Sequence, residues 1–263
     1  DRAKRLPPDN LDAWESYQRG LWHLYRFNKK DNAEARRLFR QSASTSTKFS
    51  QPLSGITHSL YFAFMHGYVE DRAATLEEAY LTGRQAVAAD DRDADAHFAL
   101  GRILYLRRDL DASIAECETA VSYNPSFSHA HLGLATALLY KARWPECIES
   151  CDRAIRLSPH DPLLFISLNI KALALLYLEE LDQAEGIARR AARLPVVEFT
   201  PHMVLAGILG HRNKVGEAQN AMQDLLRIRP EATIRYVEEI LPFSNSTDMN
   251  LLSDGLRKAG LPE

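Results

Sequence analysis

The feature that most constrains this chain is a pattern of small residues that recurs every 34 positions through its middle. The pairs that keep this spacing are Gly101 and Ala135, Ser113 and Cys147, Cys117 and Cys151, Ala120 and Ala154, and Pro125 and Pro159. A fixed period of this length is typical of repeat architectures, in which each unit packs against its neighbours. The sequence therefore predicts an array of equivalent units.

Each unit is predicted to be a pair of helices. Small residues let two helices approach closely, while large apolar side chains fill the gaps between them. Pro125 and Pro159 mark the end of the second helix in a unit, because a proline ring clashes with a continuing helical backbone. Thr200 followed by Pro201 marks a helix start, with the threonine hydroxyl as the expected cap. Each unit should therefore be a helical hairpin.

We predict a solenoid of six hairpins over residues 11–230, preceded by a linker at 1–10. The hairpins are expected near residues 11–47, 49–89, 93–124, 126–158, 162–195 and 200–229. Residues 231–263 should form capping helices, the last of them at 247–259 and ending at Gly260. One hairpin cannot bury its apolar face alone, so stacking of neighbours must supply the stability.

Composition agrees with an all-α chain and excludes several classes of partner. Glycine and proline number only 12 each, and 46% of the residues are hydrophobic, as a helical array with a continuous core requires. A formal net charge of −3 gives no basic excess for nucleic acid, and every apolar run is shorter than the roughly 18 to 20 residues of a membrane span. We expect neither nucleic acid nor a membrane as partner.

The cysteine count and the first residue suggest where the chain belongs. The three cysteines are an odd number, which does not indicate the paired framework of a small secreted domain. We therefore expect a cytoplasmic location. The chain starts at Asp1 and no signal segment follows, so we expect it to be cut from a longer protein.

The 34-residue register and the string AHFALGRILYLRRDLDASIAECETAVSYNP at 96–125 resemble the tetratricopeptide repeat. The resemblance covers roughly residues 11–230. It implies an all-α fold, a right-handed superhelical solenoid of about six helical hairpins. The typical repeat has a tryptophan early in its first helix, whereas His97 and His131 stand there in the middle units.

A narrower resemblance lies in three segments, LDAWESYQRGLWHLYRF at 11–27, RLSPHDPLLF at 156–165 and LPF…GLRKAGLPE at 241–263. Together they are similar to the carboxy-terminal region of bacterial class III adenylate or guanylate cyclases with tetratricopeptide tails. The resemblance implies a cyclase domain upstream, although related tails also follow other modules such as winged-helix regulators. No segment of this chain resembles the metal-binding aspartates of a cyclase core.

The candidates for chemistry have structural explanations that we favour. Cys147 and Cys151 are four residues apart and could share a metal, but they take the register of small core residues. His97, His131 and His202 occupy equivalent places in three hairpins, too far apart for one metal, and should be packed with one ring nitrogen bonded. No Gly-rich phosphate loop or serine nucleophile elbow is present. We expect no catalytic residue, no metal and no cofactor.

The first helices of tetratricopeptide hairpins line the concave side of the solenoid, so residues one turn apart on them predict a protein-binding groove. These residues are Tyr17, Tyr25, Tyr61, Phe98, Arg102, Tyr105, Tyr140, Asn169, Tyr177, Met203 and His211. Tyrosines are enriched at binding hot spots. Two alternatives stay open: the rings complete the packing between hairpins, or the helix at 247–259 folds back into the groove. The lysine and asparagine set of chaperone-binding relatives is absent.

These observations favour a non-catalytic protein–protein interaction and scaffolding module in a bacterial signalling protein such as an adenylate cyclase. Its expected partner is a protein or peptide, or an upstream domain of the same polypeptide; a homo-oligomer stays open. The alternative is a ligand-sensing or oligomerisation domain of a transcriptional regulator. Any catalytic activity should lie upstream of this chain.

Overall fold

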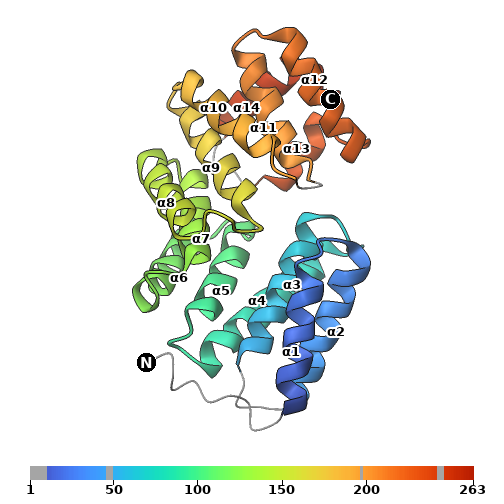
Figure 1. The fold of residues 1–263 in the computed structure, drawn as a ribbon, viewed down its shortest axis with the longest axis vertical. Helices are drawn as coiled ribbons and strands as arrows, with labels where there is room; N and C mark the ends of the chain where they lie inside the picture. Colours follow the sequence, from blue (N-terminus) through green and yellow to red (C-terminus); the bar gives the residue numbers. More distant parts are fainter. Residues whose placement is uncertain (1–10, 46–49, 196–197, 242–245) are drawn as a thin grey trace. The chain divides into compact units, whose positions relative to one another are not determined.

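The computed structural model describes residues 11–45, 50–195, 198–241 and 246–263, and all regular secondary structure in these ranges is helical (Figure 1). The predicted linker at 1–10 and the predicted hairpin start at residue 49 lie outside them. The predicted all-α fold of about six hairpins with capping helices is confirmed. None of the described helices is both long and apolar enough to cross a membrane.

The chain divides into two compact units, residues 1–130 and 131–263. In the first unit, consecutive helices pair as α1 with α2, α3 with α4 and α5 with α6. Their bounds are α1 Leu11–Leu24, α2 Lys29–Thr45, α3 Gln51–Met65, α4 Arg72–Ala89, α5 Ala94–Leu106 and α6 Leu110–Tyr123. The next helix, α7 at Ser128–Tyr140, contains the boundary between the units.

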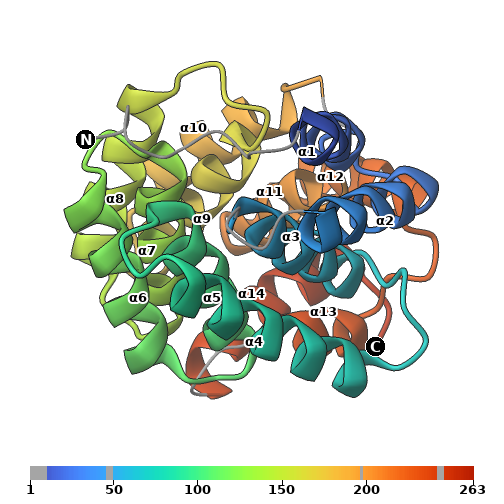
Figure 2. The same ribbon diagram turned by 90° about the horizontal axis from the view of Figure 1, so that it is seen from below.

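After α8, the second unit continues with two hairpins, α9 with α10 and α11 with α12, and then with α13 and α14. The bounds are α8 Trp144–Leu157, α9 Leu164–Tyr177, α10 Leu181–Ala192, α11 Thr200–His211, α12 Val215–Ile228, α13 Ile234–Ile240 and α14 Ser246–Ala259. Within this unit α14 packs mainly against α11 and also contacts α12 and α13 (Figures 1 and 2). The last helix therefore lies on the first helix of the last hairpin.

The small residues of the repeat sit where the two helices of a hairpin touch. A Cβ added to Gly101 on α5 would lie 2.7 Å from the sulfur of Cys117 on α6. Beside it, the Ser113 hydroxyl donates a 2.8 Å hydrogen bond to the carbonyl oxygen of Gly101. The first hairpin repeats this bond between Ser42 and the carbonyl of Ala13, at 2.6 Å. Close backbone approach explains why the 34-residue register is carried by small side chains.

The turn inside most hairpins uses a residue with positive φ. The residues in this conformation are Phe27, Arg108, Ala142, Glu179 and Asn213, with Gly67 in the second hairpin. The next amide closes the turn, as when Arg143 N donates to Leu138 O at 2.9 Å. This pattern satisfies carbonyls at the helix end that have no partner within the helix.

The cap predicted at the start of the sixth hairpin is wrong. Thr200 is the first residue of α11, Phe199 precedes it, and no side chain caps this helix. The Thr200 hydroxyl instead accepts a 3.2 Å hydrogen bond from the side-chain amide of Asn169 on α9. The hydroxyl thus joins neighbouring hairpins, and Pro201 alone favours the helix start.

Candidate functional site

Three of the predicted groove residues, Tyr61, Phe98 and Arg102, come together in the first unit around the guanidinium of Arg102. Its central carbon lies 3.4 Å from the ring centroid of Tyr61, 4.9 Å from that of Phe62 and 5.1 Å from that of Phe98. Arg102 is only 6% exposed. A desolvated cation between aromatic faces can gain about 2 kcal/mol or more, which helps to offset its burial. The cluster joins α3 to α5.

Arg102 also belongs to a polar chain that sequence reasoning missed. Its Nη1 lies 3.4 Å from Nδ1 of His58, and Nε2 of His58 lies 3.1 Å from a carboxylate oxygen of Asp95. A guanidinium can only donate a hydrogen bond, so Nδ1 of His58 is the acceptor in its contact with Arg102, and Nε2 is the nitrogen that faces Asp95. Burial raises the pKa of Asp95, but its interaction with His58 outweighs this effect and the net direction is downward. The one available signal was a histidine one turn before Phe62 on an apolar helix.

The remaining predicted groove residues of the first unit differ in exposure. Tyr105 is buried, and its hydroxyl lies 2.5 Å from that of Tyr61. Tyr17 is half-buried against Phe39, with ring centroids 5.7 Å apart, and burial followed by the charge of Asp95 raises its pKa. Tyr25 is exposed. Of the predicted tyrosines in this unit, Tyr17 and Tyr25 therefore retain surface for a partner.

In the second unit the predicted residues are spread along several helices. Tyr140, Met203 and Tyr177 are buried, and the ring of Tyr177 stacks on Trp144 with centroids 5.4 Å apart. Asn169 is buried and donates to Thr200, while its side-chain oxygen accepts no hydrogen bond within the described part of the chain.

The last predicted groove residue, His211, contacts the C-terminal helix. Its Nε2 lies 2.5 Å from the carbonyl oxygen of Leu251 on α14. Close by, a Cβ added to Gly207 on α11 would lie 2.8 Å from Leu252, also on α14. The helix expected at 247–259 thus covers this face of the last hairpin.

The equivalent histidines do not behave alike. His97 has both ring nitrogens engaged, at 2.6 Å from Glu116 and 2.8 Å from the carbonyl of Asp91, rather than the single bond expected. Burial lowers the pKa of His97, but these partners outweigh it and raise the pKa overall. Burial lowers the pKa of His202, although Asp224 opposes that shift. Equivalent positions in the repeat therefore do not give His97 and His202 the same direction of pKa shift.

The three cysteines are buried free thiols. Burial raises the pKa of Cys117 to about 12 and also raises that of Cys151, so both are thiols at neutral pH. Over residues 11–45, 50–195, 198–241 and 246–263, no three histidine, cysteine, aspartate or glutamate side chains are grouped to hold a metal ion.

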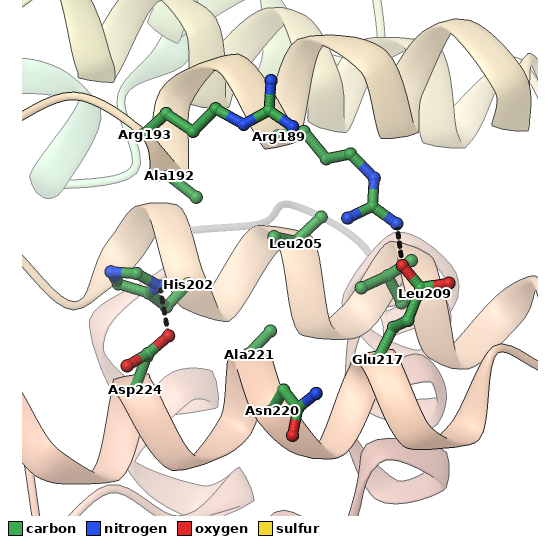
Figure 3. Close-up of a pocket in the computed structure, with 10 residues that line it drawn as sticks. All are labelled: Arg189, Ala192, Arg193, His202, Leu205, Leu209, Glu217, Asn220, Ala221 and Asp224. Carbon is green, nitrogen blue, oxygen red and sulfur yellow. Dashed lines mark hydrogen bonds and ion pairs between the residues drawn. The ribbon is translucent and has the colours of Figure 1, made fainter.

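A pocket of about 230 Å³ opens between α10, α11 and α12 of the second unit (Figure 3). Arg189 extends from α10 and Arg193 from the residue that follows its end, and Leu205 lies on α11 between the two walls. The full lining is Arg189, Ala192, Arg193, His202, Leu205, Leu209, Glu217, Asn220, Ala221 and Asp224. Charged groups of both signs thus surround an apolar floor.

The charges at this pocket are partly paired with one another. Arg189 forms ion pairs with Glu217 and, at 2.8 Å, with Glu185. His202 Nδ1 lies 3.9 Å from a carboxylate oxygen of Asp224. Of these three pairs, Arg189–Glu217 joins adjacent hairpins. The opening can present donors and acceptors to a small polar ligand.

Comparison with known proteins agrees with this architecture. Residues 78–122 match a family model described as a tetratricopeptide repeat. Among curated proteins, none matches this chain.

Three solved structures have the same fold at low identity. A chain of the APC/C hetero-tetramer Cut9–Hcn1 is 16% identical over 86% of this chain, with a TM-score of 0.65, and this chain spans only 40% of it. PilW, a widely conserved type IV pilus biogenesis factor, is 15% identical over 76% of this chain and 90% of its own, with a TM-score of 0.58. TTC0263, a thermophilic tetratricopeptide protein of Thermus thermophilus, is 17% identical over 70% of this chain and 99% of its own, with a TM-score of 0.56. The chain therefore contains a tetratricopeptide repeat at 78–122, and its hairpins have the fold of tetratricopeptide repeat proteins.

Proposed function

We propose that this chain is a protein-interaction and scaffolding module that holds a protein or peptide partner on its first-helix side. The observation that carries the proposal is the hairpin array. Its buried side chains pack between helices, and its fold is that of tetratricopeptide proteins. In the first unit, half-buried Tyr17 and exposed Tyr25 offer aromatic surface beside the buried Arg102 cluster. Aromatic side chains of this kind dominate binding hot spots.

Site-specific photo-crosslinking in cell extract tests the proposal. A photo-reactive phenylalanine analogue at Tyr17 should give discrete protein adducts, because the analogue keeps the aromatic ring in place. The same analogue at Leu81, which is 50% exposed on α4, is the matched control. Adducts at position 81 but none at position 17 would contradict a first-helix binding side.

A second candidate function is the sensing of a small ligand, and the pocket between α10, α11 and α12 favours it. Two arginines and a histidine there suit an anionic or zwitterionic molecule that also carries a donor for Glu217 or Asp224. A thermal-shift screen of small carboxylates, phosphates and amino acids checks it, since a bound ligand raises the melting temperature. The shift should vanish in Arg193→Gln and persist in Arg235→Gln, whose side chain is exposed on α13. A screen without any stabilising compound counts against sensing.

We further propose that the module belongs to a bacterial signalling protein such as an adenylate cyclase and works in the cytoplasm. The support is the resemblance of the segments at 11–27, 156–165 and 241–263, together with the unpaired, buried thiols. The test is the reading frame upstream of this chain. A cyclase core with its metal-binding aspartates would support the proposal, and a frame without a signalling domain would end it.

A further inference from the structure

The outer face of α1 carries large apolar side chains that are exposed. Leu11 is 84% exposed, Trp14 44%, Trp22 59%, and Tyr25, in the turn that continues the helix, 41%. Tyr25 N still donates to the carbonyl of Leu21 at 3.2 Å, so its side chain follows the helical spacing. Tryptophan and tyrosine at such exposure are typical of an interaction surface rather than of a solvated helix face.

These side chains form one stripe with an internal symmetry. At about 100° per residue, the four apolar residues and Gln18 fall within an arc of about 80°. Gln18 is exposed and lies at the middle of the stripe. Leu11 and Tyr25 lie seven residues on either side of Gln18, and Trp14 and Trp22 lie four residues on either side. Read in either direction along the helix, the stripe therefore presents an apolar residue at the same places.

One edge of the stripe is charged, and the charges divide along the helix. Asp12 and Glu15 precede Gln18, the middle of the stripe. Arg19 and Arg26 follow it. By the same helical angle all four lie on one side of the stripe, within an arc of about 60°. Glu15 and Arg19 are 69% and 60% exposed and lie 3.6 Å apart in one chain. The edge is thus acidic at one end and basic at the other.

We propose that α1 is a self-association surface, which pairs antiparallel with α1 of a second copy about a two-fold axis at Gln18. Such an axis brings the same edge of both helices together. Glu15 then faces the partner's Arg19, and Arg19 faces the partner's Glu15. Asp12 is placed opposite the partner's Arg26, which within its own chain also pairs with Asp31 at 3.1 Å. The apolar stripe is buried at the same time, with Trp14 beside the partner's Trp22.

A parallel pairing of the same helices, about a two-fold axis along them, would set the two charged edges on opposite sides of the pair, so neither Glu15 nor Arg19 would gain an opposite charge from the other copy. The charge pattern therefore selects the antiparallel arrangement. The stripe is about 21 Å long at 1.5 Å per residue, so one helix pair buries less than a standard interface. We expect a weak dimer with a dissociation constant of about 1 µM to 1 mM. This surface shares Tyr25 with the proposed partner-binding side of the first helices, and its pairing needs no other protein.

Charge exchange tests the geometry directly by sedimentation velocity across a concentration series. Glu15→Arg alone and Arg19→Glu alone should each weaken the dimer at least about tenfold, because each sets like charges against one another. An equimolar mixture of the two variants should restore it as a heterodimer, since positions 15 and 19 are then both basic in one chain and both acidic in the other. Glu239→Arg is the control, since Glu239 forms an exposed i,i+4 pair with Arg235 on α13.

Two further variants keep the proposal open to refutation. Gln18→Cys should form a disulfide-linked dimer on mild oxidation, because the axis passes beside this position and the native cysteines are buried. Leu81→Cys, at a position on α4 that is 50% exposed, should form no disulfide-linked dimer. Trp22→Glu should abolish the dimer while leaving the circular dichroism melting curve unchanged. A wild-type chain that stays monomeric at millimolar concentration, a mixture that fails to recover, or an unlinked Gln18→Cys would each overturn the antiparallel pairing.

Discussion

Gly210 on α11 and Gly255 on α14 cross so closely that neither could carry a side chain. A Cβ at Gly210 would overlap the carbonyl oxygen of Gly255 and lie 2.9 Å from its carbonyl carbon. A Cβ at Gly255 would lie 2.7 Å from the ring of His211. The C-terminal helix is therefore seated through direct contact of two helix backbones, which glycine permits and any other residue obstructs.

Gly255→Ala should unseat α14. The added methyl group meets backbone that cannot move aside, and overpacking of this kind costs about 1–3 kcal/mol. Hydrogen exchange measured by mass spectrometry should show lost protection over 246–259. Gly216→Ala on α12 is the matched control, because nothing lies within 4 Å of its added Cβ, and alanine there should leave stability equal or up to about 1 kcal/mol higher. Equal protection in both variants would contradict the seating.

Ala142→Gly should stabilise the chain. Ala142 has a φ of 60° in the turn before α8, a conformation that strains an L-residue with a Cβ by about 1–2 kcal/mol. Glycine relieves that strain but gains freedom in the unfolded chain, so the net increase should be about 1 kcal/mol or less. Urea unfolding measures it. Asn213→Gly, in the same conformation, should change stability less because asparagine tolerates it.

Glu198 should make stability fall as the pH rises toward neutrality. Burial raises the pKa of Glu198 to about 7, and the charge of Arg229 opposes that shift only in part. The folded chain then holds a proton that the unfolded chain releases near pH 4.5, so stability is highest below that pH and is lost up to about pH 7. The decrease should be about 3 kcal/mol at most.

Glu198→Gln isolates this effect, because the amide stays neutral at every pH. Urea unfolding between about pH 4 and pH 8 should show a shallower pH dependence than in the original chain, and greater stability at the alkaline end. Parallel curves for the two proteins would mean that Glu198 does not titrate with a raised pKa.

Glu185→Gln should destabilise the second unit. Glu185 is 7% exposed, and its carboxylate lies 2.8 Å from Arg189, 3.0 Å from Arg212 and 2.8 Å from Lys214. Burial raises its pKa, but these cations outweigh burial and lower the pKa overall. The stabilisation is therefore present at neutral pH and disappears as the pH falls through the lowered pKa.

The three cations are partly exposed, so the loss in Glu185→Gln should be about 1–3 kcal/mol rather than the full cost of breaking a buried pair. Urea unfolding at neutral pH measures it, and the difference from the original chain should shrink in acid. Glu239→Gln removes an exposed pair with Arg235 and should cost less than about 0.5 kcal/mol. A larger loss in the control would show that the buried position is not what matters.

Much of the helical hairpin array could be read from the chain because its causes are local and periodic. Pro125 and Pro159 follow helix ends at Tyr123 and Leu157, as the loss of a backbone donor requires. Gly101 and Cys117 keep their register because two helices touch there. The prediction of a hydroxyl cap at Thr200 was wrong because a non-local contact decides it. The side chain of Asn169, on a different hairpin, donates a hydrogen bond to the Thr200 hydroxyl oxygen.

The sequence by itself determined the class of fold, because repeat length, small-residue spacing and helix-ending prolines act within one unit or between adjacent units. Only the tertiary structure decided that Arg102 is buried between aromatic rings, that α14 covers α11, and that His97 and His202 have opposite pKa shifts. Burial and electrostatics depend on which side chains from distant segments surround a group. A helical spacing specifies the face on which a residue lies, but not what another element places against that face.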